Sequence, residues 1–402
     1  MSIIKSKKTF LLVLIILLSL MLFACDPSDR FSEYDVIITV IDSETDEGLE
    51  DVSLELTDYY NYVQQAEAGE ETGDYIFEAV ALETERNFEV KIEKDGYQNQ
   101  TAKVFAEANT STLEYTVLLE PETIEADKVE LVTVEAGTPV IDEIEELEYD
   151  IEMSKNLITN AQFAVFLNET AMEIEVTDEG VQYNDRLLIN LSDTIGMKPQ
   201  IGYNESEDEF YLKDWEDSDE NQIDIGKYPA IYVTWYGAAA YCNWLSEQDN
   251  LSGAYDLEEG ELIYDDREKI EGYRLPESQE WRFAATGGIE GEETTYAGSN
   301  NLDEVGWYQD NSDAEGNSNL QNAQGTLPVG EKEPNELGLY DMSGNLAEWT
   351  NTYSIKGEVA YEGGSWNCSA DSSALEDFTG QYQDKGRITP FYSGIRPVRT
   401  LD

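Results

Sequence analysis

The stretch Gly338-Leu-Tyr-Asp-Met-Ser-Gly-Asn-Leu-Ala-Glu-Trp349, followed by Gly363-Gly-Ser-Trp366, is the most informative part of this 402-residue chain. One interpretation of the first part is a structural loop in which Asp341 and Glu348 cap backbone amides, and a metal-binding loop is the alternative. Whether this loop belongs to a catalytic site depends on which reactive residue types the rest of the sequence supplies.

Two residue types limit the reactions open to this chain. The sequence has no histidine, which excludes Ser-His-Asp hydrolysis, histidine-activated thiols and the usual zinc sites. After Cys25 only Cys242 and Cys368 remain, so the chain is not a disulfide scaffold. Cys242 is expected to lie in a hydrophobic core and Cys368 to be a small buried residue beside Trp366. A reactive thiol is the alternative for Cys368. A disulfide bond between Cys242 and Cys368 is a further alternative.

The charge balance excludes some partners. With 86 acidic and 24 basic residues, the chain has a net charge of -62, which disfavours nucleic acid and anionic lipid surfaces as partners. The acidic residues are spread along the chain, as expected of a solvated acidic surface and not of a disordered acidic tail. A salty habitat or many bound cations would relieve the self-repulsion. Hydrophobic residues make up 41% of the chain, enough for packed cores.

The N-terminus predicts export. Lys5, Lys7 and Lys8 precede an apolar run that is too short for an ordinary spanning helix. The run ends in Leu22-Phe23-Ala24-Cys25, which resembles the lipobox of a bacterial lipoprotein. We therefore predict a signal peptide over residues 1–24 and lipidation of Cys25, which would anchor the chain in a membrane of the cell envelope, facing outside the cytoplasm. An ordinary secretory signal with an incidental cysteine is the alternative.

A short polar tether, residues 25–34, precedes a segment typical of strands. Apolar and polar residues alternate in several short stretches separated by turn residues. We predict a small all-β sandwich over residues 35–120 and a linker over 121–127. Its order of elements resembles that of carboxypeptidase-regulatory-like domains, which implies a spacer or adhesion module. The expected strands are Val36–Val40, Val52–Leu56, Tyr75–Phe77, Phe88–Ile92 and Tyr115–Leu119.

Residues 128–402 predict a mixed, loop-rich α+β domain. A strand is expected over Leu131–Gly137. Thr159 is a candidate cap for a helix over Asn160–Glu169. Further helices are expected from about Trp235 to Glu247 and from about Glu277 to Thr286. Long stretches rich in Gly, Asn and Asp separate these helices. Loops this long indicate an architecture stabilised by ions or by its own packing.

Several blocks in this region resemble the formylglycine-generating enzyme (sulfatase-modifying factor) family. The blocks follow one another in the family's order over about 270 residues, and the opening stretch is among them. The resemblance implies a fold similar to an elaborated C-type lectin. Blocks that carry it include Tyr228-Pro-Ala-Ile-Tyr-Val-Thr-Trp-Tyr236, Gly272-Tyr-Arg-Leu-Pro-Glu-Ser-Gln-Glu-Trp281 and Gly394-Ile-Arg-Pro-Val-Arg399.

The family's oxidase chemistry is not expected. The resemblance implies two copper-binding thiols after the Gly-Gly-Ser segment, because thiolates suit Cu(I). Placed on this sequence, those two positions are Ser373 and Phe378, neither of which supplies a thiolate. We therefore expect neither copper nor a catalytic residue.

A structural calcium ion is the cofactor that the resemblance implies. Its ligands would be the side chains of Asp341 and Glu348 and the carbonyl oxygens of Gly344 and Leu346, a set of oxygen ligands that suits a hard cation. Ala347 departs from the tryptophan usual in the family. In a chain with few cations, Arg274, Arg396 and Arg399 are expected to be partners in internal ion pairs.

The function expected is non-catalytic binding of a protein or glycan ligand. The segment from Gly363 to Tyr392 is the candidate surface, since aromatic and arginine side chains dominate interfaces. An oxidoreductase of the same family, acting on exported protein or small-molecule substrates, is the alternative. A structural envelope protein that binds divalent cations is another. The candidate binding residues are Phe378, Tyr382, Arg387, Phe391 and Tyr392.

Overall fold

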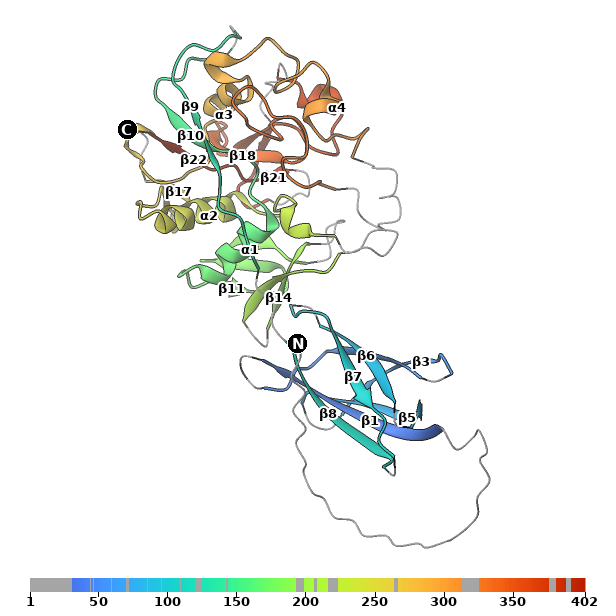
Figure 1. Ribbon diagram of the computed structural model, residues 1–402. Helices are drawn as coiled ribbons and strands as arrows, with labels where there is room; N and C mark the ends of the chain where they lie inside the picture. Colours follow the sequence, from blue (N-terminus) through green and yellow to red (C-terminus); the bar gives the residue numbers. More distant parts are fainter. Residues whose placement is uncertain are drawn as a thin grey trace, which may run out of the picture. The chain divides into compact units, whose positions relative to one another are not determined.

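The computed structural model divides the chain after Thr123 into two compact units, each described here by itself (Figure 1). The predicted leader, Cys25 and most of the tether lie outside the described residues. The structure describes residues 31–402 except 44, 46, 59, 70–71, 85, 95, 109, 120–123, 142–143, 193–198, 206–207, 216–222, 264–266, 313–324, 376–380, 388–391 and 402, and it does not describe the side chains of residues 31, 392 and 393.

In the first unit, two four-stranded sheets enclose one hydrophobic core, the arrangement of a β-sandwich. The sheet orders are β4-β5-β1-β8 and β3-β2-β6-β7. Burial alternates along the strands, because successive side chains point to opposite faces of a sheet. In β2, for example, Leu54 and Leu56 are buried, whereas Ser53 and Thr57 are exposed. The strands are β1 (Phe31–Asp42), β2 (Ser53–Thr57), β3 (Val63–Gln65), β4 (Glu67–Ala68), β5 (Asp74–Glu83), β6 (Asn87–Glu93), β7 (Gln100–Phe105) and β8 (Thr112–Leu119).

The expected strands of this unit all coincide with or overlap strands of the structure. β1 begins at Phe31, within the segment predicted as a tether, because Tyr34 is buried and its hydroxyl donates to the Glu107 carbonyl at 3.2 Å. The sequence did not predict β7, whose only buried side chains are Ala102 and Val104. That strand forms because it pairs antiparallel with β6.

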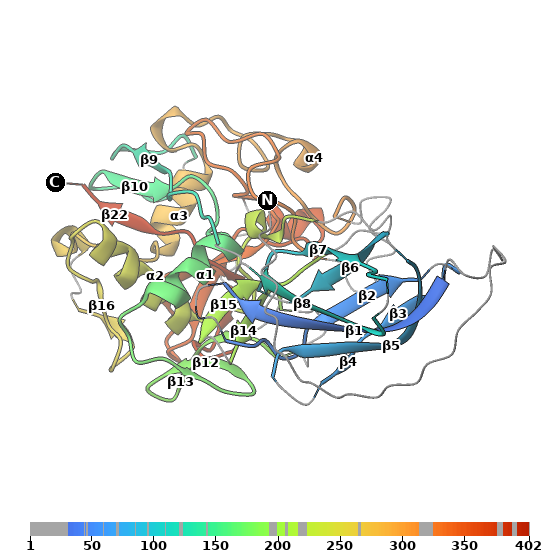
Figure 2. The ribbon, with the colours of Figure 1, turned by 60° about the horizontal axis from the view of Figure 1, so that its bottom comes forward.

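The second unit combines several small sheets with short helices and is an α+β arrangement (Figures 1 and 2). Two sheets position the signature region: β22-β10-β9 and β20-β19-β18-β21. The strands of these two sheets are β9 (Leu131–Val134), β10 (Ile151–Ser154), β18 (Ala347–Tyr353), β19 (Val359–Glu362), β20 (Gln381–Gln383), β21 (Tyr392–Gly394) and β22 (Val398–Thr400). The remaining strands are β11 (Glu175–Val176), β12 (Gly180–Tyr183), β13 (Arg186–Asn190), β14 (Ile201–Asn204), β15 (Glu209–Leu212), β16 (Tyr255–Asp256) and β17 (Glu261–Leu262).

The three expected helices are present. Thr159 caps α1 as predicted: its side chain accepts from the Gln162 backbone N–H, and the Gln162 side chain accepts from the Thr159 N–H. Phe163 and Phe166 of α1 pack on Tyr241 of α2, with ring centroids 5.9 and 5.6 Å apart, and Figures 1 and 2 show the two helices side by side. The helices are α1 (Asn160–Glu169), α2 (Trp235–Gln248), α3 (Ser278–Ala285) and α4 (Leu302–Val305), with 3-10 turns at Ile225–Lys227, Arg267–Lys269, Gly288–Glu290 and Ala370–Ser373.

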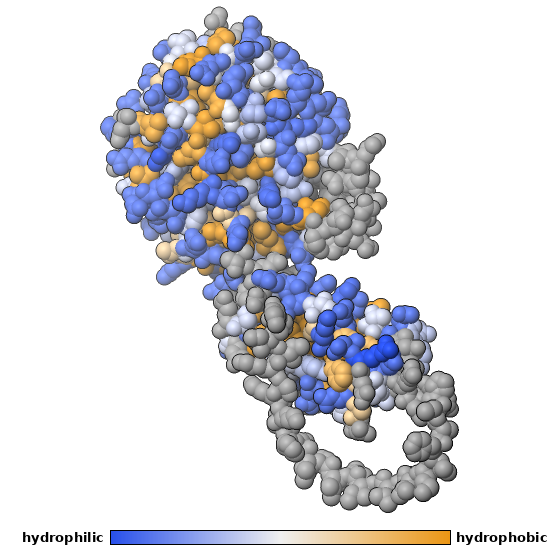
Figure 3. All heavy atoms as spheres, viewed as in Figure 1, coloured by the Kyte–Doolittle hydropathy of each residue, from blue (hydrophilic) through white to orange (hydrophobic). Residues whose placement is uncertain are grey.

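Two features of the structure concern the predicted attachment to a membrane: the length of the helices and the hydropathy of the surface. Among the described residues, no helix is both long and apolar enough to cross a membrane. The face of the second unit drawn in Figure 3 is mainly hydrophilic, with separate hydrophobic patches.

Candidate functional site

A buried ion pair closes the signature loop on the end of the chain. Glu348 belongs to β18, which pairs in parallel with β21, and Arg396 follows β21. The Arg396 guanidinium donates to both Glu348 oxygens at 2.7 to 3.0 Å, and the Trp281 indole N–H donates to the same carboxylate at 2.7 Å. The remaining N–H groups of Arg396 donate to the carbonyl oxygens of Ser154 and Tyr340, at 2.8 and 2.7 Å. One arginine therefore connects β10, the signature loop and the C-terminal segment.

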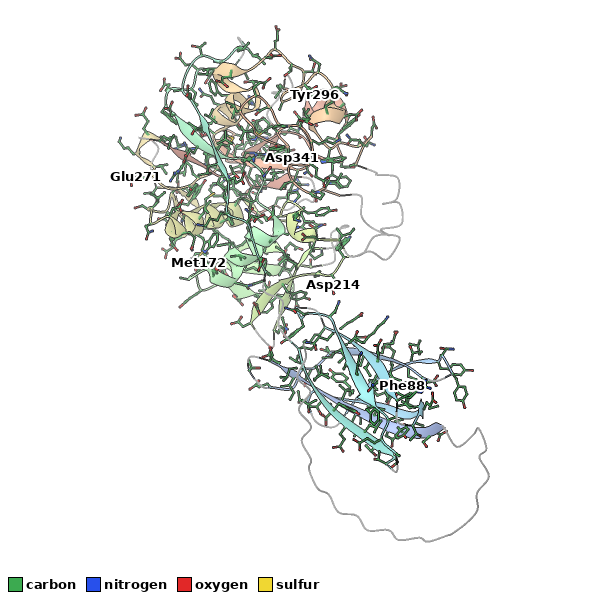
Figure 4. All side chains as sticks on the ribbon, in the orientation of Figure 1. Phe88, Met172, Asp214, Glu271, Tyr296 and Asp341 are labelled. Carbon is green, nitrogen blue, oxygen red and sulfur yellow. The ribbon has the colours of Figure 1, made fainter. Side chains whose placement is uncertain are left out.

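Asp341 lies in the interior of the unit, in a separate network (Figure 4). Its carboxylate accepts from the Gly330 backbone N–H at 2.8 Å and from the Asn345 side-chain amide at 3.3 Å. Burial raises the pKa of Asp341 to about 6, although the Gly330 hydrogen bond and the Arg396 charge oppose the rise. Asp341 is thus a desolvated carboxylate that a nearby cation would stabilise.

The two predicted calcium ligands with carboxylates fit that role unequally. Arg396 and Trp281 already occupy the oxygens of Glu348, whereas Asp341 contacts neutral donors. Across the described residues, no group of three or more acidic, cysteine or histidine side chains is placed to hold a metal ion. Asp341 therefore fits a calcium ligand, while Glu348 fits only if its pair with Arg396 opens.

Gly344 makes the close turn of this loop possible. Its φ is 92°, a backbone angle that residues with a side chain rarely adopt. A Cβ atom at this position would lie 2.2 Å from the Trp307 carbonyl oxygen. Its N–H donates to the Gly363 carbonyl at 2.7 Å, which joins the signature loop to the Gly-Gly-Ser segment. Leu346, the other predicted carbonyl ligand, is fully buried.

The described residues contain no pair of thiols. Ser373 is buried at the end of a 3-10 turn, and within the described part of the chain its hydroxyl has no hydrogen-bond partner. Phe378, the second predicted thiol position, lies outside the described residues. Cys242 and Cys368 are both free. Cys242 is a core residue as predicted, and burial raises the pKa of its thiol.

The expectation that Cys368 is buried is wrong in degree. The residue is half-buried, with its sulfur 3.1 Å from the Ser365 hydroxyl oxygen, because it ends the turn that its N–H closes on the Ser365 carbonyl at 2.9 Å. Trp366 itself is buried.

The candidate binding residues are only partly described. Tyr382, on β20, is 41% exposed, and Arg387 is exposed a few residues later. Tyr392 contributes its backbone to β21, but its side chain is not described. Phe378 and Phe391 lie outside the described residues. The structure thus places Tyr382 and Arg387 at the surface, on either side of one turn.

Lys385 anchors that turn, a feature the sequence did not reveal. Its ammonium lies 4.3 Å from the ring centroid of Trp235 and 4.6 Å from that of Tyr353, and it donates to the Gly260 carbonyl at 2.6 Å. Its own carbonyl accepts from the Trp235 N–H at 3.1 Å. Burial lowers the pKa of Lys385. The turn between Tyr382 and Arg387 is therefore fixed on the N-terminus of α2.

The predicted internal ion pairs of Arg274 and Arg396 are confirmed, whereas the pair of Arg399 is not internal. Arg274 contacts both Glu280 oxygens, at 2.7 and 2.6 Å, and both residues are buried. Arg399 pairs with Glu152 at 2.6 Å, at a partly exposed edge. The sequence did not single out a further pair, between Arg282 and Glu362, at 2.8 Å.

Together, the fold and the site define a loop-rich α+β domain whose signature loop is closed by a buried Glu–Arg pair. The chain belongs to the family of the sulfatase-modifying factor enzyme 1-like domain, whose model matches residues 84–401. The match covers all of β6, β7 and β8 in the first unit as well as the second unit.

Two relatives illustrate the range of the family. The chain is 35% identical over 203 residues to "Chaperone protein LppX" of Paenibacillus barcinonensis, covering 43% of this chain and 70% of that protein. It is 31% identical over 150 residues to "Inactive C-alpha-formylglycine-generating enzyme 2" of Mus musculus, covering 36% of this chain. In the second case the match spans only 40% of the relative's length.

Two solved structures resemble the chain at lower sequence identity. CarF is 24% identical with a TM-score of 0.46, over 68% of this chain and 99% of that one. Treponema denticola variable protein 1 is 19% identical with a TM-score of 0.44, over 70% of this chain and 98% of that one.

Proposed function

We propose that this chain is a non-catalytic, lipid-anchored envelope protein that binds a protein or glycan ligand through a C-type-lectin-like domain. The observation that carries the proposal is the buried hydroxyl of Ser373 at the first predicted thiol position. Neither Cys242 nor Cys368 has a second thiol as partner. Oxidation of a substrate cysteine through a copper-binding thiol pair therefore lacks its reactive groups.

The anchored turn at Lys385 supports binding. Tyr382 and Arg387 project from a turn that Lys385 fixes on Trp235 and Tyr353. Fixing a contact surface beforehand lowers the ordering cost of association. Tyrosine and arginine are also enriched among the residues that carry binding energy.

The relatives support the same direction. One is named a chaperone and another an inactive formylglycine-generating enzyme. We extend the first name to this chain as a proposal: its ligand would be an exported protein that it escorts or holds at the membrane, with a glycan as the other candidate. The lipobox-like Leu22-Phe23-Ala24-Cys25 supplies the anchor.

Calcium enters the proposal as a structural ion. Asp341 would be its carboxylate ligand, with the carbonyl oxygens of Gly344 and Leu346. Glu348 would join only after Arg396 moved away. The ion would neutralise a buried carboxylate and hold the signature loop, without any part in a reaction.

An array of glycans and exported proteins, probed with the mature chain with and without calcium, tests the proposed function. The expected result is a specific ligand whose binding is lost in a Tyr382→Ala/Arg387→Ala variant. Absence of any ligand that depends on these two residues would contradict the C-terminal surface as the binding site. Glu290→Gln is a control for changes at exposed positions elsewhere on the same unit and should leave binding unchanged.

A further inference from the structure

A second surface of this unit has the composition of a site for organic cations. A cavity of about 540 Å³ opens between the end of α1, the β12–β13 turn and the second half of α2. This volume lies within the range of about 300–1,000 Å³ typical of ligand pockets. Its walls include Met172, Tyr183 and Trp244. Figure 4 shows Met172 at the periphery of the unit, away from Asp341.

The aromatic wall is fixed in place by the core. The Trp244 ring lies 5.8 Å from the Phe166 ring and 5.5 Å from the Tyr241 ring, measured between centroids. Next to it, the Asn243 side chain donates to the Tyr255 carbonyl at 2.9 Å and accepts from the Tyr255 N–H at 3.0 Å. The ring is therefore held in one position before any ligand arrives, and tryptophan is the side chain that attracts a cation best.

The rim of the cavity is acidic. Glu173, Glu247 and Glu258 line it and are exposed, and the described lining residues include no lysine or arginine. These three carboxylates also form no ion pair with any described residue of the chain. The cavity thus combines a tryptophan side chain, packed on the core, with three carboxylates that form no ion pair with described residues.

We propose that this cavity binds lysine or arginine side chains from a basic segment of a partner protein. Three carboxylates exceed what one small cation neutralises, whereas a basic segment supplies several positive charges. The net charge of -62 attracts such a segment from a distance. This inference rests on the proposed partner binding and adds a surface separate from Tyr382 and Arg387.

Calorimetric titration of the full chain tests the site. The probes are acetylated tetra-arginine amide, which presents the cation on a peptide, and tetramethylammonium, a free organic cation. We expect the peptide to bind the wild type and a Glu173→Gln/Glu247→Gln/Glu258→Gln variant to raise its Kd about tenfold or more. Trp244→Phe should raise Kd by about threefold, since phenylalanine keeps the ring but attracts a cation less strongly.

The matched control is Glu290→Gln/Glu292→Gln/Glu293→Gln, which removes the same charge from exposed positions outside the cavity. It should change Kd less than about twofold. An equal loss in the control would reduce the effect to general surface charge and overturn the site. Absence of peptide binding, or equally tight tetramethylammonium binding, would overturn the peptide-borne ligand. Tyr382→Ala/Arg387→Ala should leave the peptide Kd unchanged, so failure here is separable from failure at the C-terminal surface.

Discussion

The Arg396 guanidinium contacts both oxygens of the Glu348 carboxylate across 48 residues of sequence, and both side chains are fully buried. The pair joins the signature loop to the C-terminal segment. The pair thus fixes one point of a loop that has little regular structure before β18.

Breaking this pair on one side should be costly. Glu348→Leu or Arg396→Met is expected to lower the free energy of unfolding by about 3–5 kcal/mol, because the remaining charge is left buried and unpaired. The double variant should recover much of that loss. Chemical denaturation measures all three. As a control, Lys227→Ala removes the exposed pair with Asp224 and should cost under about 1 kcal/mol. Single variants within that margin would contradict the role assigned to the pair.

Asp341 should make stability depend on pH. Its folded pKa of about 6 lies above the ordinary 3.8, so the folded state binds the proton more tightly than the unfolded state. Stability therefore falls as pH rises from about 4 to about 6, by up to about 3 kcal/mol for roughly two pKa units. Asp341→Asn should lack this slope. Denaturation curves in chelator across this range give the comparison, and parallel pH profiles would refute it.

Calcium should offset the loss of stability that the ionised, buried Asp341 carboxylate causes. Above pH 6, adding calcium to chelated protein is expected to raise Tm, with about 2.7 kcal/mol of stabilisation at a calcium concentration 100 times Kd. Magnesium, which demands a stricter geometry, should do less. The Asp341→Asn variant should show no calcium effect. A wild-type Tm that is insensitive to both calcium and chelator would contradict the calcium site.

Cysteine oxidation should be absent. With copper and oxygen, the chain is expected to convert no cysteine of a peptide substrate to formylglycine, as followed by mass spectrometry. The reason is that Ser373 offers a hydroxyl and Cys242 is buried with a raised thiol pKa. Cys368→Ser should behave like the wild type. Turnover that depends on Cys368 would restore the oxidoreductase hypothesis.

Substitutions of exposed and of buried aromatic residues in the C-terminal segment should differ in their effects on stability and on binding. Tyr382→Ala is expected to change stability by no more than about 0.5 kcal/mol while weakening binding of the ligand found on the array. Trp366→Ala should instead cost about 3–5 kcal/mol, because it empties a buried site. Thermal unfolding and binding, measured on the same samples, distinguish the two. A Tyr382 variant that unfolds early would make that residue structural.

Local patterns carried most of what the sequence predicted. Alternating residues identified the strands around Val36 and Phe88, and the Thr159–Gln162 spacing identified the start of α1, because each depends on neighbours in the chain. The scarcity of cations correctly indicated that Arg274 and Arg396 are paired inside.

Contacts between distant segments were beyond the sequence. Lys385 meets Trp235 and Tyr353 only after the fold has formed, and nothing in the residues around it indicates this. The exposure of Cys368 depends on the same kind of packing. The cavity beside Trp244 combines four segments that no motif connects.

The anchoring of the turn at Lys385 also bears on how such a surface can evolve. β20 pairs with β19 on one side, and Lys385 fixes the turn at its middle, so these contacts do not involve the exposed side chains of Tyr382 and Arg387. Substitutions at those positions can accumulate without unfolding the domain. If the proposed binding surface includes this turn, related chains could acquire new ligand preferences there on an unchanged framework.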